Sequence, residues 1–361
     1  MKKRFLSVLT VAVMTAATIL TGCSGTQTAA TTAAPAATES KSEAATTEAS
    51  KDETKAEAKE GEKKEIVVGF SQVGAESDWR TANTESMKST FTEANGYKLI
   101  FDDAQQKQEN QLKAVRNFIQ QDVDYIVIAP VTETGWDTVL QEAKDAGIPV
   151  IIVDRMINVS DDSLYTAWVG SNFLQEGYDA VAWLDGYLKA NNKADKEINI
   201  VTIQGTIGSS AQIGRTNGVE EKMKDHPKWK MLERQTGEFT QAKGQEVMES
   251  FLKTYNNIDV VIAENDNMAF GAIDAIKAAG KTCGPKGDIT IISFDAVAAA
   301  FDSMIAGDMN VSVECNPLHG PRVAEIIQKL EKGETVDKIA YVKEGVFPAD
   351  TAAAEKPKRQ Y

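Results

Sequence analysis

An acid, an indole and a guanidinium fall within one short stretch early in the sequence. Glu76, Trp79 and Arg80 follow residues 66–70, an apolar and β-branched run that is typical of a strand buried in a parallel sheet. Ligands of open α/β sheets bind beyond the carboxyl ends of the strands, so these side chains suit a polar molecule with an apolar face. The alternative is a helix start in which Glu76 and Asp78 favour the helix dipole and Trp79 only packs.

Further charged or amide side chains stand where later strands are predicted to end or the next helix to begin. They are Asp154, Arg155, Arg215, Asn265 and Asp295. Any one of them is explained as an ordinary polar loop residue, but their recurrence predicts a shared binding site. Hydroxyl groups donate and accept hydrogen bonds, and this set offers carboxylates that accept, guanidiniums that donate and an amide that does both.

The formal charge of this candidate site is balanced. Its acids are Glu76, Asp154 and Asp295, and its bases are Arg80, Arg155 and Arg215. Phosphate or a carboxylated sugar prefers a cationic surplus, so the balance favours a neutral polyol. Trp79 would then offer its flat apolar surface to the C–H face of a sugar ring.

The same carboxylates permit a second interpretation, an enzyme. Asp154 and Asp295 could serve as the paired acids of a glycoside hydrolase. However, an arginine is expected near each carboxylate, which would keep its pKa low and make it a poor general acid. The sequence has only two histidines and no CxxC or HExxH pattern, so neither catalysis nor a metal or cofactor is predicted. Cys283 and Cys315 are expected to be free thiols, although a disulfide stays open.

About 300 residues follow residue 64, more than one compact core usually holds. Apolar runs alternate there with amphipathic segments of helical length, at residues 98–101, 125–129, 150–153, 198–203, 260–263 and 289–294. This alternation predicts an α/β protein with two doubly wound parallel-sheet lobes and a ligand cleft between them.

The chain is expected to cross between these lobes three times. The N-terminal lobe would comprise residues 65–171 and 316–342, and the C-terminal lobe residues 172–315 and 343–361. The return to the first lobe is expected because the run at 311–316 breaks the alternation. In addition, the helix predicted at 323–330 needs a sheet to cover.

The first 64 residues have a different composition. Residues 1–22 combine a basic start, an apolar run and small residues, which predicts an export signal. With Cys23 they resemble the lipobox of bacterial lipoproteins, and by that resemblance a lipidated Cys23 anchors the exported protein to the outer face of the cell membrane. Residues 23–64 are almost entirely Ala, Thr, Ser, Glu and Lys, and are predicted to be a disordered tether. The alternative is an ordinary signal peptide or a transmembrane anchor.

From residue 65 onward the chain resembles the type I periplasmic sugar-binding proteins of ABC transporters, in the ribose and galactose group. The motifs that carry the resemblance are GFSQVGAESDWR, QQKQENQLKAVRNFI, VDYIVIAPVTETGW, IPVIIVDR, QGTIGSSAQIGR, FTQAKGQEVMESF and NDNMAFGAIDAIK, which are most similar to galactofuranose-binding proteins. The resemblance implies that Trp79 stacks on the sugar ring and that the sugar hydroxyls are hydrogen-bonded by Glu76, Arg80, Asp154, Arg155, Arg215, Asn265 and Asp295. It also implies a monomer whose partners are a monosaccharide and the transmembrane subunits of an ABC permease.

Two features qualify the expected ligand. Ribose binders of this group complete the site with an amide near residue 311, where this chain reads VSVECN, so Glu314 or Asn316 could substitute. Trp79 is bulkier than the phenylalanine that the resemblance places there in ribose binders, and Arg80 adds a long donor. We therefore expect galactofuranose first, with ribose and galactopyranose next.

Two other functions share the fold. A regulator of the lactose-repressor type would need an N-terminal helix-turn-helix, where this chain has the predicted signal and tether. The net charge of −14 also argues against nucleic acid as a partner. A sensor that passes the sugar signal to a membrane kinase or chemoreceptor stays an open alternative.

Overall fold

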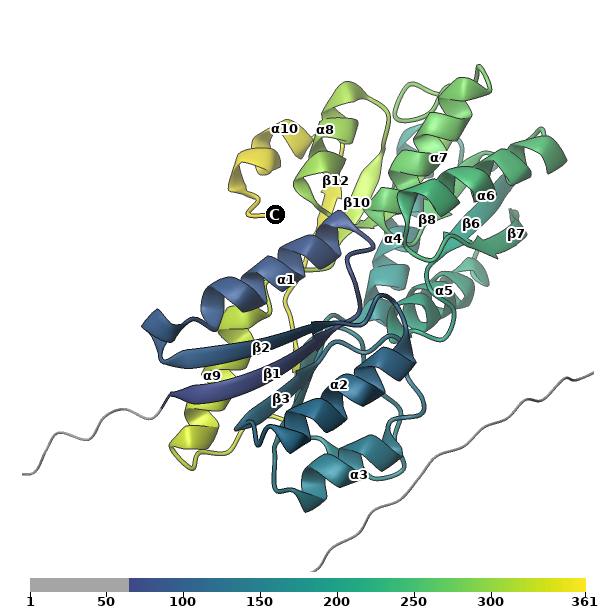
Figure 1. Cartoon of the computed structure of the whole chain (residues 1–361). Coiled ribbons are helices and arrows are strands. Elements are labelled where there is room, and N and C mark those ends of the chain that lie inside the picture. The colour runs from purple at the N-terminus through teal and green to yellow at the C-terminus, as the bar shows by residue number, and fades with distance from the viewer. Residues whose placement is uncertain (1–64) are drawn as a thin grey trace, which may run out of the picture. The chain divides into compact units, whose positions relative to one another are not determined.

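The computed structural model of this chain describes residues 65–361. The predicted signal peptide, Cys23 and the tether lie outside the described residues. Two sheets, each with helices on both faces, make up most of the described part (Figure 1). None of the helices within residues 65–361 has the length and apolar character needed to cross a membrane.

The first sheet has the strand order β11-β5-β4-β3-β1-β2, and its neighbouring strands are all parallel. Its strands are β1 (Ile66–Gln72), β2 (Tyr97–Asp103), β3 (Tyr125–Ile128), β4 (Val150–Val153), β5 (Ala167–Gly170) and β11 (Ile339–Tyr341). The chain passes from β1 to β2 and then returns to β3 on the other side of β1. The carboxyl ends of β1 and β3 therefore form a switch point, where ligands of such sheets bind.

The second sheet repeats this order as β12-β10-β9-β8-β6-β7. Its strands are β6 (Ile198–Gln204), β7 (Trp229–Thr236), β8 (Val260–Ala263), β9 (Thr290–Asp295), β10 (Val311–Glu314) and β12 (Val346–Pro348). Only β12 is antiparallel to its neighbour in this sheet. The switch point of the second sheet lies between β6 and β8.

Four helices cover the first sheet, and we call this unit the first lobe. They are α1 (Asp78–Thr90), α2 (Gln108–Gln120), α3 (Asp137–Asp145) and α9 (Gly320–Glu331). Helices α1 and α9 lie side by side on one face, where Met87 and Ile327 join the same apolar core (Figure 1). Helices α2 and α3 cover the other face through residues such as Phe118 and Leu140.

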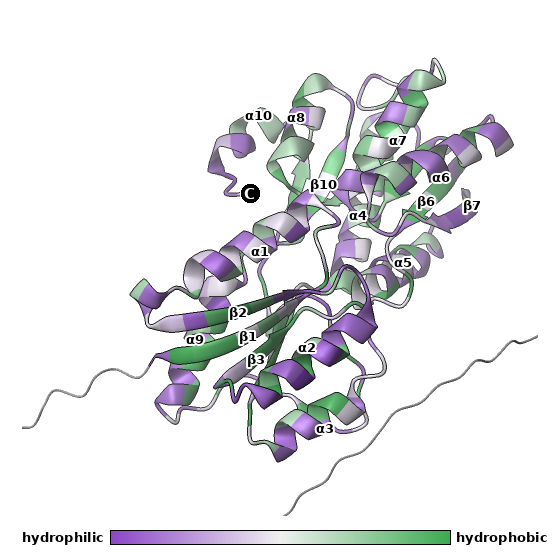
Figure 2. Cartoon of the chain, viewed as in Figure 1, coloured by the Kyte–Doolittle hydropathy of each residue, from purple (hydrophilic) through white to green (hydrophobic). Residues whose placement is uncertain are grey.

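The helices of the second sheet complete what we call the second lobe. They are α4 (Phe173–Ala190), α5 (Ser210–Met223), α6 (Gln241–Thr254), α7 (Asp266–Ala278), α8 (Ala298–Ala306) and α10 (Ala352–Glu355). Leu184 of α4 and Val219 of α5 share one core with the strands, and Phe251 of α6 shares another with α7 and α8. Figure 2 shows apolar strands between helices whose surfaces carry polar residues.

The chain passes between the lobes after β5, after β10 and after β11. We call these segments the first, second and third crossings. The helix expected at residues 323–330 is α9, and Val323 packs in the core of the first lobe with Val68. The exact lobe boundaries given above stay a prediction. Strands β5, β7, β11 and β12 were not among the predicted apolar runs.

Candidate ligand-binding site

A cavity lies where the carboxyl ends of the two sheets face each other. It is lined by all the residues that the sequence predicted for the site: Glu76, Trp79, Arg80, Asp154, Arg155, Arg215, Asn265 and Asp295. Ser77, Phe173, Ala211, Phe239 and Cys315 complete the lining. The lining therefore combines charged, amide and aromatic side chains.

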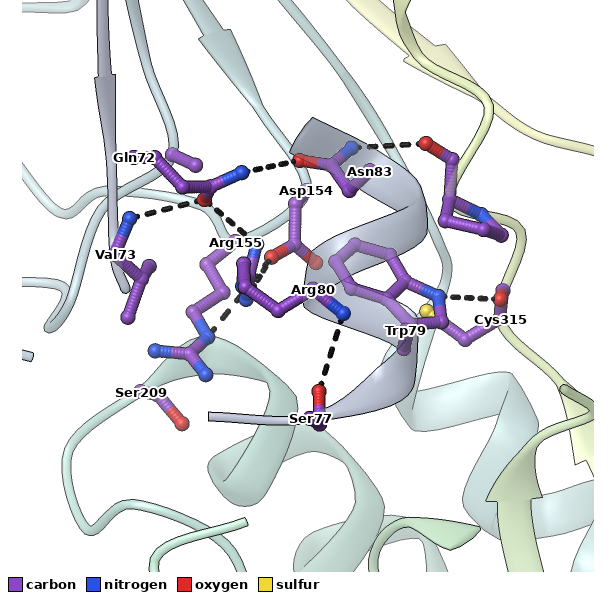
Figure 3. Close-up of polar contacts among 12 residues, drawn as sticks. Gln72, Val73, Ser77, Trp79, Arg80, Asn83, Asp154, Arg155, Ser209 and Cys315 are labelled. Atoms are coloured by element: carbon purple, nitrogen blue, oxygen red, sulfur yellow. Dashed lines mark hydrogen bonds and ion pairs between the residues drawn. The ribbon is translucent and has the colours of Figure 1, made fainter. Parts of the chain in front are cut away.

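In the first lobe, Arg80 is held by acceptors on several sides. Ser77 caps α1 by accepting the backbone N–H of Arg80, which fixes the helix start. The guanidinium donates from Nε to Glu76 Oε1 at 3.0 Å. Its Nη1 donates to Gln72 Oε1 at 3.2 Å, and its Nη2 pairs with Asp154 Oδ2 at 2.8 Å (Figure 3). The second oxygen of Glu76, Oε2, is buried without a partner among the described residues, so it is available to a ligand hydroxyl.

In the second lobe, Arg215 occupies the corresponding position. Its Nε lies 2.6 Å from Glu176 Oε2 and its Nη2 lies 3.3 Å from Asp295 Oδ1. Its Nη1 donates to the backbone carbonyl of Glu264, and the guanidinium lies 4.9 Å from the ring centre of Phe294. The guanidinium of Arg215 is buried, and these contacts give it the hydrogen-bond acceptors and opposite charges that a buried cation requires.

The two acid–arginine pairs come from equivalent places in the two sheets. Arg80 lies in the helix after β1 and Arg215 in the helix after β6, while Asp154 follows β4 and Asp295 ends β9. Both aspartates have positive φ angles, 63° for Asp154 and 105° for Asp295. Such angles are uncommon for residues other than glycine and collect at functional sites, where they aim a side chain into the cavity.

Glycines bring α4 and α5 into backbone contact beside Arg215. A Cβ atom at Gly218 would lie 2.4 Å from the carbonyl oxygen of Leu174, and one at Gly177 would lie 2.7 Å from the carbonyl oxygen of Arg215. A side chain at either place would push the helices apart. The main chain that carries Arg215 is therefore fixed against α4.

Aromatic rings form the remaining walls. Trp79 donates its indole N–H to the carbonyl oxygen of Cys315 at 2.6 Å, and the Arg80 guanidinium lies 4.7 Å from the indole ring centre (Figure 3). Although Trp79 belongs to α1, it packs in an apolar core of the second lobe. From the first lobe, Arg155 reaches to 5.0 Å from the ring of Phe239 in the second.

Asn265 has a mainly structural set of contacts. Its Oδ1 accepts the backbone N–H of Met268 and caps α7, and its Nδ2 donates to the carbonyl oxygen of Phe239 at 3.0 Å. The amide keeps one N–H for a ligand. Asn265 therefore also holds Phe239 in place, a role that the sequence did not predict.

A family model described as a periplasmic binding protein domain matches residues 68–334 of this chain. The chain belongs to this family. Its predicted fold, the two-lobed type I fold with parallel sheets, is therefore confirmed. Like its relatives the chain is a binding protein and not an enzyme, and its family is one of exported proteins.

Similar proteins are known by sequence and by structure. The chain is 45% identical over 299 residues to the galactofuranose-binding protein YtfQ of Escherichia coli strain K12, covering 82% of this chain and 92% of the relative. A Mycobacterium smegmatis protein solved with β-D-fucofuranose has a TM-score of 0.78 and 44% identity, covering 82% of this chain and 95% of that one. The binding component of the arabinose ABC transporter of Shewanella sp. ANA-3, solved with α- and β-L-arabinofuranose, has a TM-score of 0.76 and 46% identity, covering 82% and 96%.

Hydrogen bonds across the cleft show that this periplasmic binding protein is in a closed arrangement. The backbone N–H of Asp78 donates to Asn267 Oδ1 at 3.0 Å, and that of Met156 donates to Ser210 Oγ at 2.7 Å. Residue Glu133 adds a backbone bond to the carbonyl oxygen of Gly208 at 3.0 Å. In each pair the donor belongs to the first lobe and the acceptor to the second.

The second crossing contributes a residue other than the two open candidates from the sequence, neither of which was assigned to the site. Neither Glu314 nor Asn316 lines the cavity, whereas Cys315 between them does. Glu314 is instead engaged by Arg359, whose Nη2 lies 2.8 Å from Glu314 Oε1. Both Cys283 and Cys315 are free and buried, in agreement with the prediction of free thiols.

The expectation that a neighbouring arginine keeps each carboxylate's pKa low is wrong for Asp295. Burial raises the pKa of Asp295 well above its ordinary value, and this effect outweighs the attraction of Arg215. The nearby carboxylates of Asp266, Glu176 and Asp154 act in the same direction. Burial also raises the pKa of Glu176 to about 7. The low-pKa argument against catalysis therefore fails here, and the assignment as a binding protein depends on the family.

His319 contacts Trp79 edge to face, with 5.9 Å between the ring centres, and should make the protein sensitive to acid. Its ring is buried, Nδ1 lies 2.9 Å from the amide nitrogen of Asn83, and burial lowers its pKa to about 4. The pKa of histidine in the unfolded chain is about 6.5. The contribution of neutral, buried His319 to the free energy of unfolding is therefore complete above pH 6.5 and is lost as the pH falls through 6.5 toward 4. We expect a loss of about 3 kcal/mol over that range.

An NMR titration of the histidine ring protons tests this prediction. His226 is the only other histidine of the chain, so His226→Gln leaves the signal of His319 alone. His319 should stay neutral down to about pH 5. Urea unfolding should show the same decrease in the free energy of unfolding at acid pH in wild type and in His226→Gln. Titration of His319 near pH 6.5 in the folded protein would contradict the prediction.

Proposed function

We propose that this protein captures a neutral monosaccharide in the furanose form, with galactofuranose as the first candidate. The observation that carries the proposal is the pairing of charges around the cavity. Arg80 and Arg215 are each held between two carboxylates, and Arg155 approaches Glu76 Oε1 to 3.6 Å. Each of the three arginines that line the cavity thus already contacts a carboxyl group, which leaves no unpaired guanidinium to attract phosphate or a uronic acid.

The ring form is proposed from the relatives and from the shape of the site. YtfQ is named for galactofuranose, and the two similar solved structures hold fucofuranose and arabinofuranose. In this chain, Trp79 and Phe239 would contact the apolar face of the ring. The hydroxyls would bond to Glu76, Arg80, Asp154, Arg155, Arg215, Asn265 and Asp295, as the resemblance implies.

Capture would proceed by closure of the two lobes around the sugar. Residues of the first lobe would bind first, and those of the second would then close over the ligand, which makes the closed form dominant. In this proposal residues 65–171 with 316–342 move as one body and the rest as the other. The protein would be a lipoprotein anchored through Cys23, and an ABC permease would recognise the closed form and receive the sugar.

Isothermal titration calorimetry with a panel of sugars tests the proposal. We expect galactofuranose, or a stable methyl galactofuranoside, to bind more tightly than ribose or galactopyranose, and galacturonic acid to show no binding. X-ray scattering at saturating sugar should give a smaller radius of gyration than the sugar-free protein. Tight ribose binding with no response to the furanoside would refute the ring-form assignment, and identical scattering curves would refute closure.

A further inference from the structure

Glu344 joins the three crossings between the lobes through one carboxylate oxygen. Glu344 lies in the third crossing, and its Oε1 accepts the hydroxyl of Ser171 from the first crossing at 2.6 Å. The same oxygen accepts the backbone N–H of Asn316 from the second crossing, also at 2.6 Å. Any rotation of the lobes has to move these segments relative to one another, so it acts directly on these bonds.

The backbone alone connects the crossings less completely. The first and third are joined by the N–H of Val342 and the carbonyl of Gly170 at 2.9 Å, and the second and third by the N–H of Glu314 and the carbonyl of Gly345 at 2.8 Å. Between the first and second, the Oγ atom of Ser171 lies 3.2 Å from the Sγ atom of Cys315. Glu344 supplies the other connection between them.

This group of residues also contacts the ligand cavity. Cys315 lines the cavity, and Glu176, just after the first crossing, holds Arg215. One side-chain atom from each of Glu176, Cys315 and Glu344 lies within 4.8 Å of the others. Glu344 itself does not line the cavity. It is therefore placed to act on the ligand through the hinge and not by contact.

We propose that Glu344 is a positioning residue that fixes the hinge in the orientation in which the two lobes enclose the ligand. This role rests on the proposed capture of a sugar by closure. The two hydrogen bonds are short and add to the backbone bonds between the crossings, so losing them would let the closed form open more readily. Sugar affinity falls when the binding-competent form is less populated.

The surroundings of Glu344 give this role a dependence on pH. Burial and then the carboxylate of Glu176 raise the pKa of Glu344 to about 8, with Glu314 on β10 acting in the same direction. Cys315, the other titratable group that faces it, has its pKa raised by burial. Glu344 is thus mainly protonated at neutral pH in the closed form. Hydration in the open form would return the pKa of this carboxyl toward 4.5, so closure takes up a proton. Affinity is then highest below pH 4.5 and declines as the pH rises from there to about 8.

The test compares Glu344→Ala with Glu344→Gln by calorimetry between pH 6 and pH 9. Alanine removes both hydrogen bonds, and we expect it to raise the sugar Kd about tenfold or more at every pH. Glutamine keeps an oxygen that accepts both bonds and cannot ionise. Its sugar Kd should be no higher than that of wild type at pH 6 and should stay constant up to pH 9, whereas the wild-type Kd rises. Glu334→Ala, which removes an exposed carboxylate, is the control and should behave as wild type.

A second readout does not require a sugar. Spin labels at the exposed positions Lys88 and Asp274, one in each lobe, report the separation of the lobes in the ligand-free protein. Glu344→Ala should shift this distribution toward larger separations, and Glu344→Gln should not. If no sugar binds to wild type, the proposed function fails while the label distances still test the hinge. Unchanged distances and an unchanged Kd in a folded Glu344→Ala protein would overturn the role.

Discussion

Replacing Arg215 with glutamine should reduce sugar affinity by at least about 100-fold and lower the free energy of unfolding by about 3–5 kcal/mol. The guanidinium is buried between Glu176 and Asp295, and it also donates to the carbonyl of Glu264. Its removal leaves two carboxyl groups without their cation in a site closed to water. The cavity then loses its main donor from the second lobe.

The matched control for this change is Arg234→Gln in the same lobe. Arg234 pairs with Glu220 at 2.9 Å, but the two side chains are 32% and 43% exposed. Exposed pairs contribute only about 0–1 kcal/mol, so this variant should bind sugar and unfold in urea as wild type does. Calorimetry and urea unfolding check both variants. An Arg215→Gln protein with unchanged affinity would remove Arg215 from the site.

Replacing Trp79 with alanine should raise the sugar Kd by about 10- to 100-fold and lower the free energy of unfolding by about 3–5 kcal/mol. The indole is 4% exposed and packs in a core of the second lobe although its helix belongs to the first. Its removal therefore opens a cavity between the lobes. It also frees the carbonyl oxygen of Cys315 in the second crossing.

Two further variants separate the roles of this side chain. Trp79→Phe keeps an aromatic face but loses the indole N–H. Compared with Trp79→Ala, it should therefore retain most of the stacking on the sugar but not the hydrogen bond to Cys315. Trp183→Ala removes an indole of equal size that stacks on Tyr187, away from the cavity, and should leave the Kd unchanged. Full affinity in Trp79→Ala would refute the stacking role.

The sequence predicted the site wherever a polar side chain directly follows an apolar strand. Asp154 and Asp295 were found in this way, because strands β4 and β9 are fully buried and read as continuous apolar runs. Phe239 was missed because it follows β7, whose exposed and half-buried residues include Lys230 and Glu233 and show no such run. Phe239 does lie in the motif FTQAKGQEVMESF, so the resemblance was the one feature of the sequence that could have pointed to it.

Other features depend on contacts between distant segments, which a single sequence does not display. Glu176 lies in a helix and reads as a solvent-facing residue, yet it is 3% exposed because α5 packs against it with Arg215. Strands β11 and β12 have three residues each and are not fully buried, so neither gives an apolar run. Their pairing decides where the third crossing and Glu344 lie. The raised pKa of Asp295 likewise reflects burial that spacing alone does not reveal.

The close contact of α4 and α5 through Gly177 and Gly218 has a consequence for how this pocket can be redesigned. Any larger residue at these glycines meets a backbone oxygen, so the wall that carries Arg215 tolerates little change in shape. The opposite wall is built from the side chains of α1, chiefly Trp79 and Arg80, so its shape is set by side chains and not by a close contact between main chains. Libraries aimed at a new sugar preference should therefore randomise the α1 wall and leave the α4–α5 wall intact.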